Sequence, residues 1–257
     1  MDIKGKVAVI TGGGSGIGRA TAERLAHEGA AVVVADVDEA GGLETVKRIE
    51  AAGGRALFVK ADVTQERDLR QSFGAALDKF GRFDILHNNA GIAVGPPGFP
   101  EAEPARWRAV VELDLQAVVL GTGIAATIMQ RSGGGVIINT ASMAGLYPHR
   151  QDPVYGAAKA GVVNFTNSCA HWASERKIRV NCVCPGVVDT PMVRRGMERA
   201  RAAGMQMALP SRIIQPEEIA DAVVTLIKDD SLFGCALEVR PTGRQIVDPR
   251  PAPGSRR

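Results

Sequence analysis

The chain of 257 residues has few aromatic residues and few cysteines, at 4% and four residues respectively. So few rings argue against a surface that stacks nucleic-acid bases. The cysteines are too few and too irregularly spaced for a disulfide framework, and none of them forms a familiar redox or zinc motif. We therefore expect no metal site and structural roles for Cys169, Cys182, Cys184 and Cys235.

Long apolar runs and a strong excess of one charge are also missing. No apolar run approaches the roughly 18 residues of a membrane span, and the residues after Met1 lack a signal-peptide core. The net charge of +3 is small, and part of it lies in residues 248–257, whose prolines and arginines predict a flexible basic tail. We expect a cytoplasmic protein that binds neither nucleic acid nor membrane.

Glycine and proline, in contrast, are frequent, with 30 and 14 residues, which suits many short connections between elements. Apolar, β-branched runs typical of strands covered on both faces alternate with segments of helical spacing. The runs lie at residues 7–11, 31–35, 56–60, 85–87, 136–139 and 178–182, with a last strand within 234–243. This order predicts an α/β protein built on an open, doubly wound parallel sheet.

No composition break divides the chain, so we predict one domain over residues 1–247. In such sheets ligands bind at the carboxyl ends of the strands. Two segments follow predicted strand ends, at residues 95–100 and 187–214. The second is longer than most connections, which favours a substrate lid there over an ordinary surface loop.

A cluster of glycines follows the first predicted strand and opens the first helix. Gly12, Gly14, Gly16 and Gly18 allow a tight turn and close backbone approach, and the free amides at the helix start attract phosphate. Ser15 and Ile17 lie in the same loop. The pattern therefore predicts a dinucleotide site.

Asp36 ends the next strand, 18 residues after Gly18. A carboxylate there accepts hydrogen bonds from the adenosine ribose and repels a 2′-phosphate, so NAD is favoured over NADP. Asp38 adds to the repulsion. The alternative is that Asp36 is a solvated turn residue.

These residues place the chain near a known family. Thr11-Gly-x-x-x-Gly16-x-Gly18, Asp62-Val63, Asn88-Asn89-Ala90-Gly91, Ser142, Tyr155-x-x-x-Lys159 and Pro185-Gly186 with Thr190 occur in the family's order. Over residues 5–240 the sequence resembles the short-chain dehydrogenase/reductases, in the subgroup of about 250-residue single-domain enzymes. The resemblance implies a Rossmann-like sheet of about seven strands with helices on both faces, and a homo-oligomer, either dimer or tetramer.

Tyr155 and Lys159 are four residues apart, so on a helix they share a face. A nearby ammonium favours the phenolate form of a tyrosine, whose reference pKa is about 10. By resemblance, Tyr155 takes the proton of a secondary alcohol while hydride leaves for the nicotinamide. Ser142 then holds the substrate oxygen, and Lys159 also binds the nicotinamide ribose.

The resemblance also assigns cofactor contacts beyond the glycine loop and Asp36. It places Asp62 and Val63 beside the adenine and the Pro185–Thr190 segment beside the nicotinamide. We expect Asn89 to brace the backbone more than to touch the ligand. The further positions implied by the motifs are Ala90, Gly91, Gly186 and Val188.

Two departures from the family pattern stand out. Asp114 occupies a position that is usually Asn, where the side chain supports a water-mediated proton relay behind the lysine. We expect Asp114 to keep that role with an altered pH dependence. The chain also lacks the common Asp-Gly-Gly finish after its last strand, which puts the usual tetramer contacts in doubt.

The substrate is less well defined by the sequence. Methionines between Thr190 and Leu209, including Met192, suit a bulky apolar or cyclic alcohol such as a sterol, or else pack the lid onto the core. Tyr147 is a further candidate for the pocket wall. The alternatives to an NAD-dependent alcohol dehydrogenase are an NADPH-dependent ketone reductase and a catalytically weak dinucleotide-binding sensor or scaffold.

Overall fold

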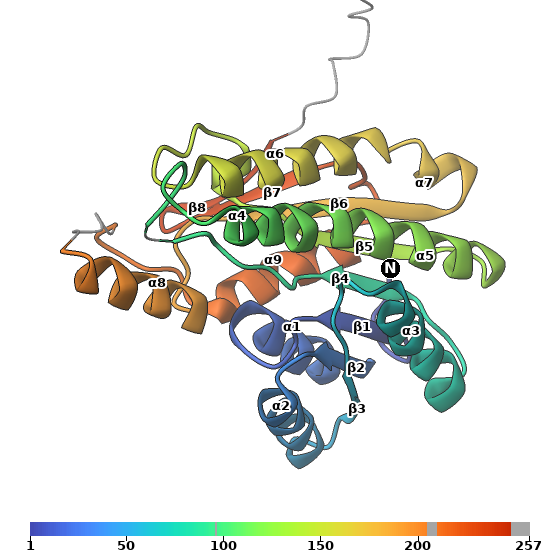
Figure 1. Cartoon of the computed structure of the whole chain (residues 1–257). Coiled ribbons are helices and arrows are strands. Elements are labelled where there is room, and N and C mark those ends of the chain that lie inside the picture. The colour runs from blue at the N-terminus through green and yellow to red at the C-terminus, as the bar shows by residue number, and fades with distance from the viewer. Residues whose placement is uncertain (96, 205–209, 248–257) are drawn as a thin grey trace, which may run out of the picture.

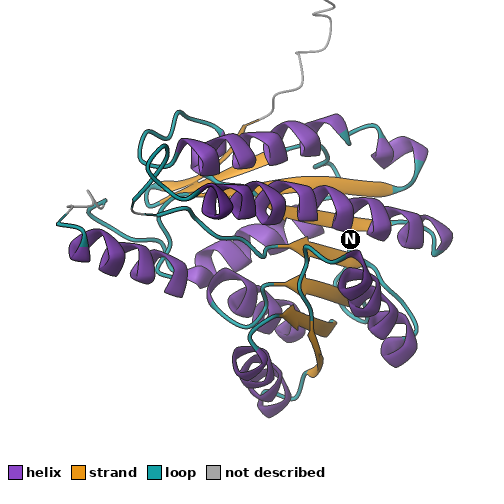
Figure 2. Cartoon of the chain, viewed as in Figure 1, coloured by secondary structure: helices purple, strands orange, loops and turns teal. Residues whose placement is uncertain are grey.

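A single sheet of eight strands forms the centre of the computed structural model, which describes residues 1–95, 97–204 and 210–247 (Figures 1 and 2). The strand order is β3-β2-β1-β4-β5-β6-β7-β8, with β1 to β7 parallel. The order reverses between β1 and β4, which is where doubly wound sheets bind their ligands. The strands are β1 (Val7–Thr11), β2 (Ala31–Asp36), β3 (Arg55–Lys60), β4 (Ile85–Asn88), β5 (Gly135–Thr140), β6 (Ile178–Pro185), β7 (Ala236–Arg240) and β8 (Gly243–Val247).

The α/β class and the doubly wound sheet are confirmed, but the expected count of about seven strands is one too low. The strand that was missed, β8, pairs antiparallel with β7 through a short hairpin at the sheet edge. Its residues are mostly exposed and polar, so it lacks the buried β-branched run that marks the other strands.

Helices cover both faces of the sheet, as predicted. One face carries α1 (Gly16–His27), α2 (Glu39–Ala51) and α9 (Pro216–Lys228), whose apolar residues share one core cluster. The other carries α3 (Glu66–Phe80), α5 (Ala117–Arg131) and α6 (Pro153–Ser168). Figure 1 shows α4, α5 and α6 together on this second face. The shorter elements are α4 (Pro104–Val111), η1 (Glu112–Gln116), η2 (Met143–Gly145), α7 (Trp172–Glu175) and α8 (Pro191–Ala202).

The core is aliphatic, as the low aromatic content requires. Strands β1, β4, β5 and β6 are buried along their whole length. Phe73 of α3 and Phe83 are the exception, stacked with their ring centroids 4.9 Å apart. The four cysteines are all buried.

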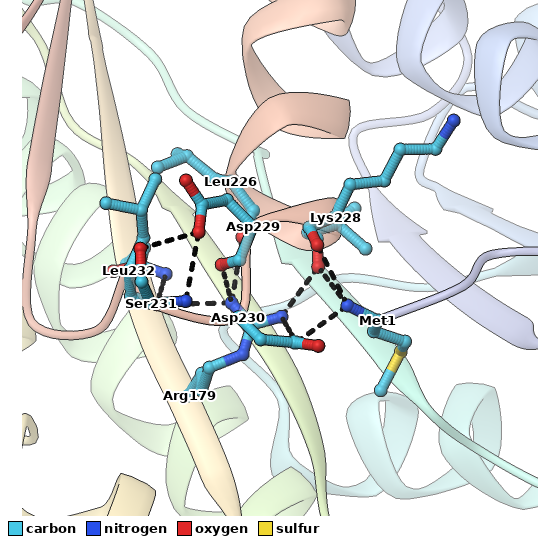
Figure 3. A network of polar contacts seen from close by, with 10 residues as sticks. Met1, Arg179, Leu226, Lys228, Asp229, Asp230, Ser231 and Leu232 are labelled. Atoms are coloured by element: carbon cyan, nitrogen blue, oxygen red, sulfur yellow. Dashed lines mark hydrogen bonds and ion pairs between the residues drawn. The ribbon is translucent and has the colours of Figure 1, made fainter.

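A buried arginine ties α9 to the sheet. Arg179 of β6 donates to the carbonyl oxygens of Leu226, Ile227, Asp229 and Leu232, at 2.6–3.1 Å, around the carboxyl end of α9. Figure 3 shows this network, in which Asp230 also pairs with Arg179 at 2.9 Å. The last carbonyls of a helix have no partners within it, so the guanidinium satisfies groups that burial would otherwise leave unpaired.

The expectation that no apolar run reaches membrane-span length needs correction. Residues Pro104–Arg131 form 28 helical residues, long and apolar enough to cross a membrane by length and composition. Half of the most apolar window is buried inside the protein, which is usual for a core helix, and the run includes the buried Asp114.

The predicted lid corresponds to α8 and its flanking segments. Val188 and Ile214 form a β-bridge that joins the two ends of the 187–214 segment. Within this segment, α8 extends outward from the carboxyl ends of the strands (Figure 1). Met205, Met207 and Leu209 lie outside the described residues, as does the predicted basic tail at 248–257. The single-domain boundary at residue 247 stays a prediction.

Candidate active site

A cleft of about 380 Å³ opens at the carboxyl ends of the strands, a volume within the usual range for small-ligand sites. It is lined by residues from both halves of the sheet. The glycine loop and Asp36 lie in its wall, and so do Ser142, Tyr155 and Lys159. The two groups of residues singled out in the sequence therefore share one cavity.

The glycine loop is packed so tightly that side chains would not fit. A Cβ on Gly18 would lie 2.1 Å from the carbonyl oxygen of Gly12, and one on Gly12 would lie 2.8 Å from the Cα of Ala90. Ser15 precedes the first turn of α1, yet its side chain makes no capping hydrogen bond, and that turn contains no acidic residue. The amides and the hydroxyl are left available to phosphate oxygens, as a dinucleotide site requires.

Asp36 holds the shape of this loop as well as facing the cleft. Its Oδ2 accepts a hydrogen bond from the Gly14 amide at 2.8 Å, and its Oδ1 accepts one from the Asp38 amide at 2.9 Å. The carboxylate is thus fixed at the end of β2 with acceptor capacity remaining for ribose hydroxyls. These contacts argue against the alternative that Asp36 is a solvated turn residue.

The position of Tyr155 is set by the start of α6. Asp152 caps this helix, with Oδ1 accepting from the Tyr155 amide at 3.0 Å and Oδ2 accepting from the Val94 amide at 2.9 Å. Ser142 begins η2, whose Gly145 packs so closely on α6 that a Cβ would lie 2.6 Å from the Lys159 carbonyl. This close approach brings the Ser142 loop and the Tyr155 turn together.

Lys159 is buried and its ammonium is fixed by two oxygens. Its Nζ donates to the Thr140 carbonyl oxygen at 2.9 Å and lies 3.1 Å from Oδ2 of Asp114. It also lies 5.6 Å from the centre of the Tyr155 ring. The spacing of four residues therefore places both side chains on one face of α6, as predicted.

Asp114 lies in a segment where the helix is locally underwound. Residues 112–116 form a π-helical turn, η1, between α4 and α5, a feature often found at functional sites. Asp114 is fully buried, and its Oδ1 accepts a hydrogen bond from the Ile92 amide at 2.8 Å. Its Oδ2 makes an ion pair with Lys159 without hydrogen-bond geometry. The Asp114 carboxylate thus faces the Lys159 ammonium directly.

Burial and this ion pair change the protonation of the whole group. Burial raises the pKa of the Asp114 carboxyl, which Lys159 opposes. Burial alone would lower the pKa of Lys159. The interactions with Asp114 and Tyr155 raise this pKa by more, so the net pKa is raised and the ammonium persists. Burial also raises the pKa of Tyr155; Lys159 and Ser142 lower it, whereas Asp114 raises it. The lysine's preference for phenolate is therefore partly cancelled by Asp114.

Two residues behind the site were not singled out in the sequence. Thr140 lines the cleft and supplies the carbonyl that holds Lys159. His87 of β4 is fully buried, and its Nε2 lies 2.8 Å from the Thr140 hydroxyl. Burial lowers the pKa of His87 to about 3, so the ring is neutral and acts as a support. Nothing in its sequence context separates it from an ordinary strand residue.

Most of the residues proposed for the cofactor lie in the cleft wall. They are Gly12, Ser15, Gly16, Ile17, Asp36, Asp62, Val63, Asn89, Ala90, Gly91, Tyr155, Lys159, Pro185, Gly186, Val188 and Thr190. Asn89 also donates to the carbonyl oxygens of Thr11 and Gly12, at 3.0 and 3.3 Å, so it braces the backbone as expected. Gly14 and Gly18 are not among the residues that line the cleft.

The residues predicted to contact the substrate do not all lie in the cleft wall. Ser142, Tyr155 and Met192 line the cleft, but Tyr147 does not. Its hydroxyl accepts a hydrogen bond from Arg240 at 3.0 Å and lies 3.4 Å from the buried Glu238 of β7, so it faces the sheet edge. Other residues of the cleft wall were missed in the sequence, among them Val37, Ala61, Ile92, Leu113, Ala141, Pro191 and Arg195. Within the described residues, no cluster of three or more His, Cys, Asp or Glu side chains could hold a metal ion.

A dinucleotide loop and a Ser-Tyr-Lys group in one cleft define a nicotinamide-dependent oxidoreductase site. The sequence comparison agrees, because residues 6–200 match the family model of the short chain dehydrogenases. The chain belongs to this family, which confirms the resemblance.

Three relatives of this chain are alcohol dehydrogenases by name. It is 42% identical to a cis-4-hydroxycyclohexanecarboxylate dehydrogenase of Sinomonas cyclohexanicum, over 89% of this chain and 91% of the relative. It is 34% identical to the NAD(+) 15-hydroxyprostaglandin dehydrogenase of Mus musculus, over 93% and 91%. It is 37% identical to a cyclohexanol dehydrogenase of an Acinetobacter strain, over 89% and 90%.

Solved structures agree on the fold. A levodione reductase superposes with a TM-score of 0.83 at 33% identity, over 92% of this chain and 96% of that structure. A 3-ketoacyl-(acyl-carrier-protein) reductase from Brucella melitensis, complexed with NADH, gives 0.82 at 34% identity, over 92% and 97%.

Proposed function

We propose that the protein is an NAD-dependent dehydrogenase that interconverts an alicyclic secondary alcohol and its ketone. The observation that carries this proposal is the single cleft shared by the glycine loop, Asp36 and the Ser142, Tyr155 and Lys159 side chains. The named activities of the three relatives support the alcohol class, and one of those names includes NAD(+).

The residues of the cleft fit a bound dinucleotide. The uncapped Ser15 and the first amides of α1 would hold the diphosphate, and Asp36 would hold the adenosine ribose. Lys159, with its ammonium already turned into the cleft, would hold the second ribose. When bound, the oxidised nicotinamide supplies a hydride acceptor.

The proton of the alcohol is the part of the reaction that this chain must handle. Tyr155 would accept it as the C–H bond transfers its electron pair, and the Ser142 hydroxyl would hold the substrate oxygen in place. Burial and Asp114 raise the pKa of Tyr155, and Lys159 and Ser142 act against them in favour of the phenolate that this step requires. In the reverse direction the same phenol returns the proton to the forming alkoxide.

The substrate pocket favours an apolar ring. Ile92, Leu113, Met192 and Val193 line the cleft along with the catalytic residues. Two of the relatives act, by name, on a cyclohexane ring, and the third on a prostaglandin. We therefore place a cyclohexanol-type alcohol ahead of a sterol.

A homo-oligomer is the assembly we propose, and a dimer is favoured over a tetramer. The edge of β7 is covered by β8, so it is not free to pair with another chain. Between Glu112 and Arg131 the only charged residue is the buried Asp114, and Val119 of α5 is exposed. An uncharged outer helix face suits a contact with a second copy. Light scattering after size-exclusion chromatography tests this.

The function is tested by incubating the purified protein with NAD, then with NADP, against cyclohexanol, 4-hydroxycyclohexanecarboxylate and linear secondary alcohols. Absorbance of the reduced nicotinamide should rise with NAD and the cyclic alcohols. Turnover with NADP alone would favour the ketone-reductase alternative. Binding of NAD without turnover of any alcohol would favour the sensor.

A further inference from the structure

The wall of the cleft carries more negative than positive charge. Two cations face four carboxylates, and the residues concerned are Lys159 and Arg195 against Asp36, Asp38, Asp62 and Asp114. A dinucleotide brings two further negative charges in its diphosphate. Because like charges repel more strongly in a partly buried cleft than in water, a cation close to the diphosphate would strengthen the hold of the α1 amides on it.

Lys159 is not free to supply that charge. Its ammonium pairs with Asp114 and donates to the Thr140 carbonyl, deep beside Tyr155. Arg195, in contrast, makes no hydrogen bond or ion pair with any other part of the chain that the structure describes. Of the two cations in the cleft wall, Arg195 is therefore the one whose charge is not paired with another described residue.

The geometry of α8 turns Arg195 toward the cleft. Arg195 follows Pro191 by four residues and Met192 by three, so the three share a helix face, and all three line the cavity. The neighbouring Arg194 differs, because it forms a two-point ion pair with Asp189 at 2.7 and 2.9 Å. One arginine thus braces the start of α8 while the next faces the ligand space.

The start of α8 packs on the phosphate loop. A Cβ on Gly16 would lie 3.0 Å from Cγ2 of Thr190 and 3.7 Å from Cδ of Pro191. Thr190 caps α8, with its hydroxyl accepting from the Val193 amide at 3.3 Å. Arg195 therefore projects from a turn that is anchored against the loop that would hold the diphosphate.

We propose that Arg195 anchors the diphosphate of the dinucleotide from the side opposite the glycine loop. An arginine can meet two phosphate oxygens at once with its planar guanidinium, which makes it suited to this role. The contact ties α8 to the cofactor, so cofactor binding also positions Met192 and Val193 over the substrate. This inference rests on the proposed dinucleotide binding.

The test measures NADH binding to the full-length protein by fluorescence titration, for the wild type and for Arg195→Gln. We expect the dissociation constant to rise roughly fivefold to tenfold, the effect of losing one charge-assisted phosphate contact. Arg199→Gln is the matched control, because this exposed residue lies one turn further on α8 and is outside the cleft wall. It should bind NADH as the wild type does.

Binding of cofactor fragments shows which part of the dinucleotide Arg195 contacts. ADP-ribose, which contains the diphosphate, should lose affinity for Arg195→Gln, whereas adenosine should not. An equal loss for both fragments, an equal loss in Arg199→Gln, or no loss of NADH affinity would each overturn the proposal.

The alternative is that Arg195 recognises a carboxylate of the substrate. Two substrates, one with and one without a carboxylate, test this alternative. If Arg195→Gln raises KM for 4-hydroxycyclohexanecarboxylate but not for cyclohexanol, and NADH binding is unchanged, the proposal is wrong and the anion is on the substrate. Failure of the wild type to bind NADH would instead remove the proposed function itself, and this inference with it.

Discussion

Asp36→Asn provides a quantitative test of cofactor selection. The carboxylate ends β2, holds the amides of Gly14 and Asp38, and lines the cleft. Asparagine has nearly the same shape, but the charge is lost, and because one oxygen becomes an NH2 donor only one of these two amide hydrogen bonds can be kept.

The effect on NAD follows from the ribose hydrogen bonds. A hydrogen bond to a charged group contributes about 1.5–3 kcal/mol, so kcat/KM for NAD should fall about tenfold to a hundredfold. The effect on NADP has the opposite sign. Two unit charges about 5 Å apart repel by roughly 3 kcal/mol at an effective dielectric constant near 20, and exposure to solvent reduces this. Removing the repulsion should raise kcat/KM for NADP about tenfold.

The ratio of kcat/KM for NAD over NADP should therefore fall by at least about a hundredfold in Asp36→Asn. It is measured with cyclohexanol by absorbance of the reduced nicotinamide. Asp38→Asn is the comparison and should change the ratio less, because Asp38 is exposed and caps α2 through the Gly41 amide. An unchanged ratio in Asp36→Asn, or a larger change in Asp38→Asn, would refute this account of selection.

Three further predictions concern the site and its support. Asp114→Asn removes the negative charge that raises the pKa of Tyr155, so the alkaline rise of the oxidation rate should move to lower pH; a pH–rate profile identical to the wild type would contradict this. Gly18→Ala places a Cβ 2.1 Å from a backbone oxygen, and should lower NADH affinity at least about tenfold in a fluorescence titration; wild-type affinity would show that the loop is not the phosphate site. Arg179→Met leaves the carbonyls at the end of α9 unpaired and should lower the free energy of unfolding by about 2–4 kcal/mol in a urea titration, with a loss under 1 kcal/mol counting against the capping role.

The features that sequence reasoning predicted well are short-range ones. The glycine loop is defined by spacing between one strand and one helix, and Tyr155 and Lys159 by a single helical turn. The strands of the central sheet are visible because burial on both faces demands continuous apolar runs.

The features that were missed depend on tertiary contacts. The edge strand β8 is exposed and carries no apolar run. Tyr147 lies outside the cleft because Glu238 and Arg240, about ninety residues away in sequence, engage its hydroxyl. Arg195 is one of several arginines in its helix, and only the orientation of α8 distinguishes it. The π-helical turn that aims Asp114 at Lys159 has no spacing signal of its own.

The central claim is that Tyr155 transfers the proton of an alcohol whose hydride goes to NAD. Tyr155→Phe removes only the hydroxyl, so NADH binding should remain at the wild-type level in a fluorescence titration. The measurement is the single-turnover rate of NADH formation from a cyclic secondary alcohol. It should fall by about a hundredfold to ten-thousandfold, the usual contribution of a positioned acid–base group. A rate within a few fold of the wild type would contradict the account.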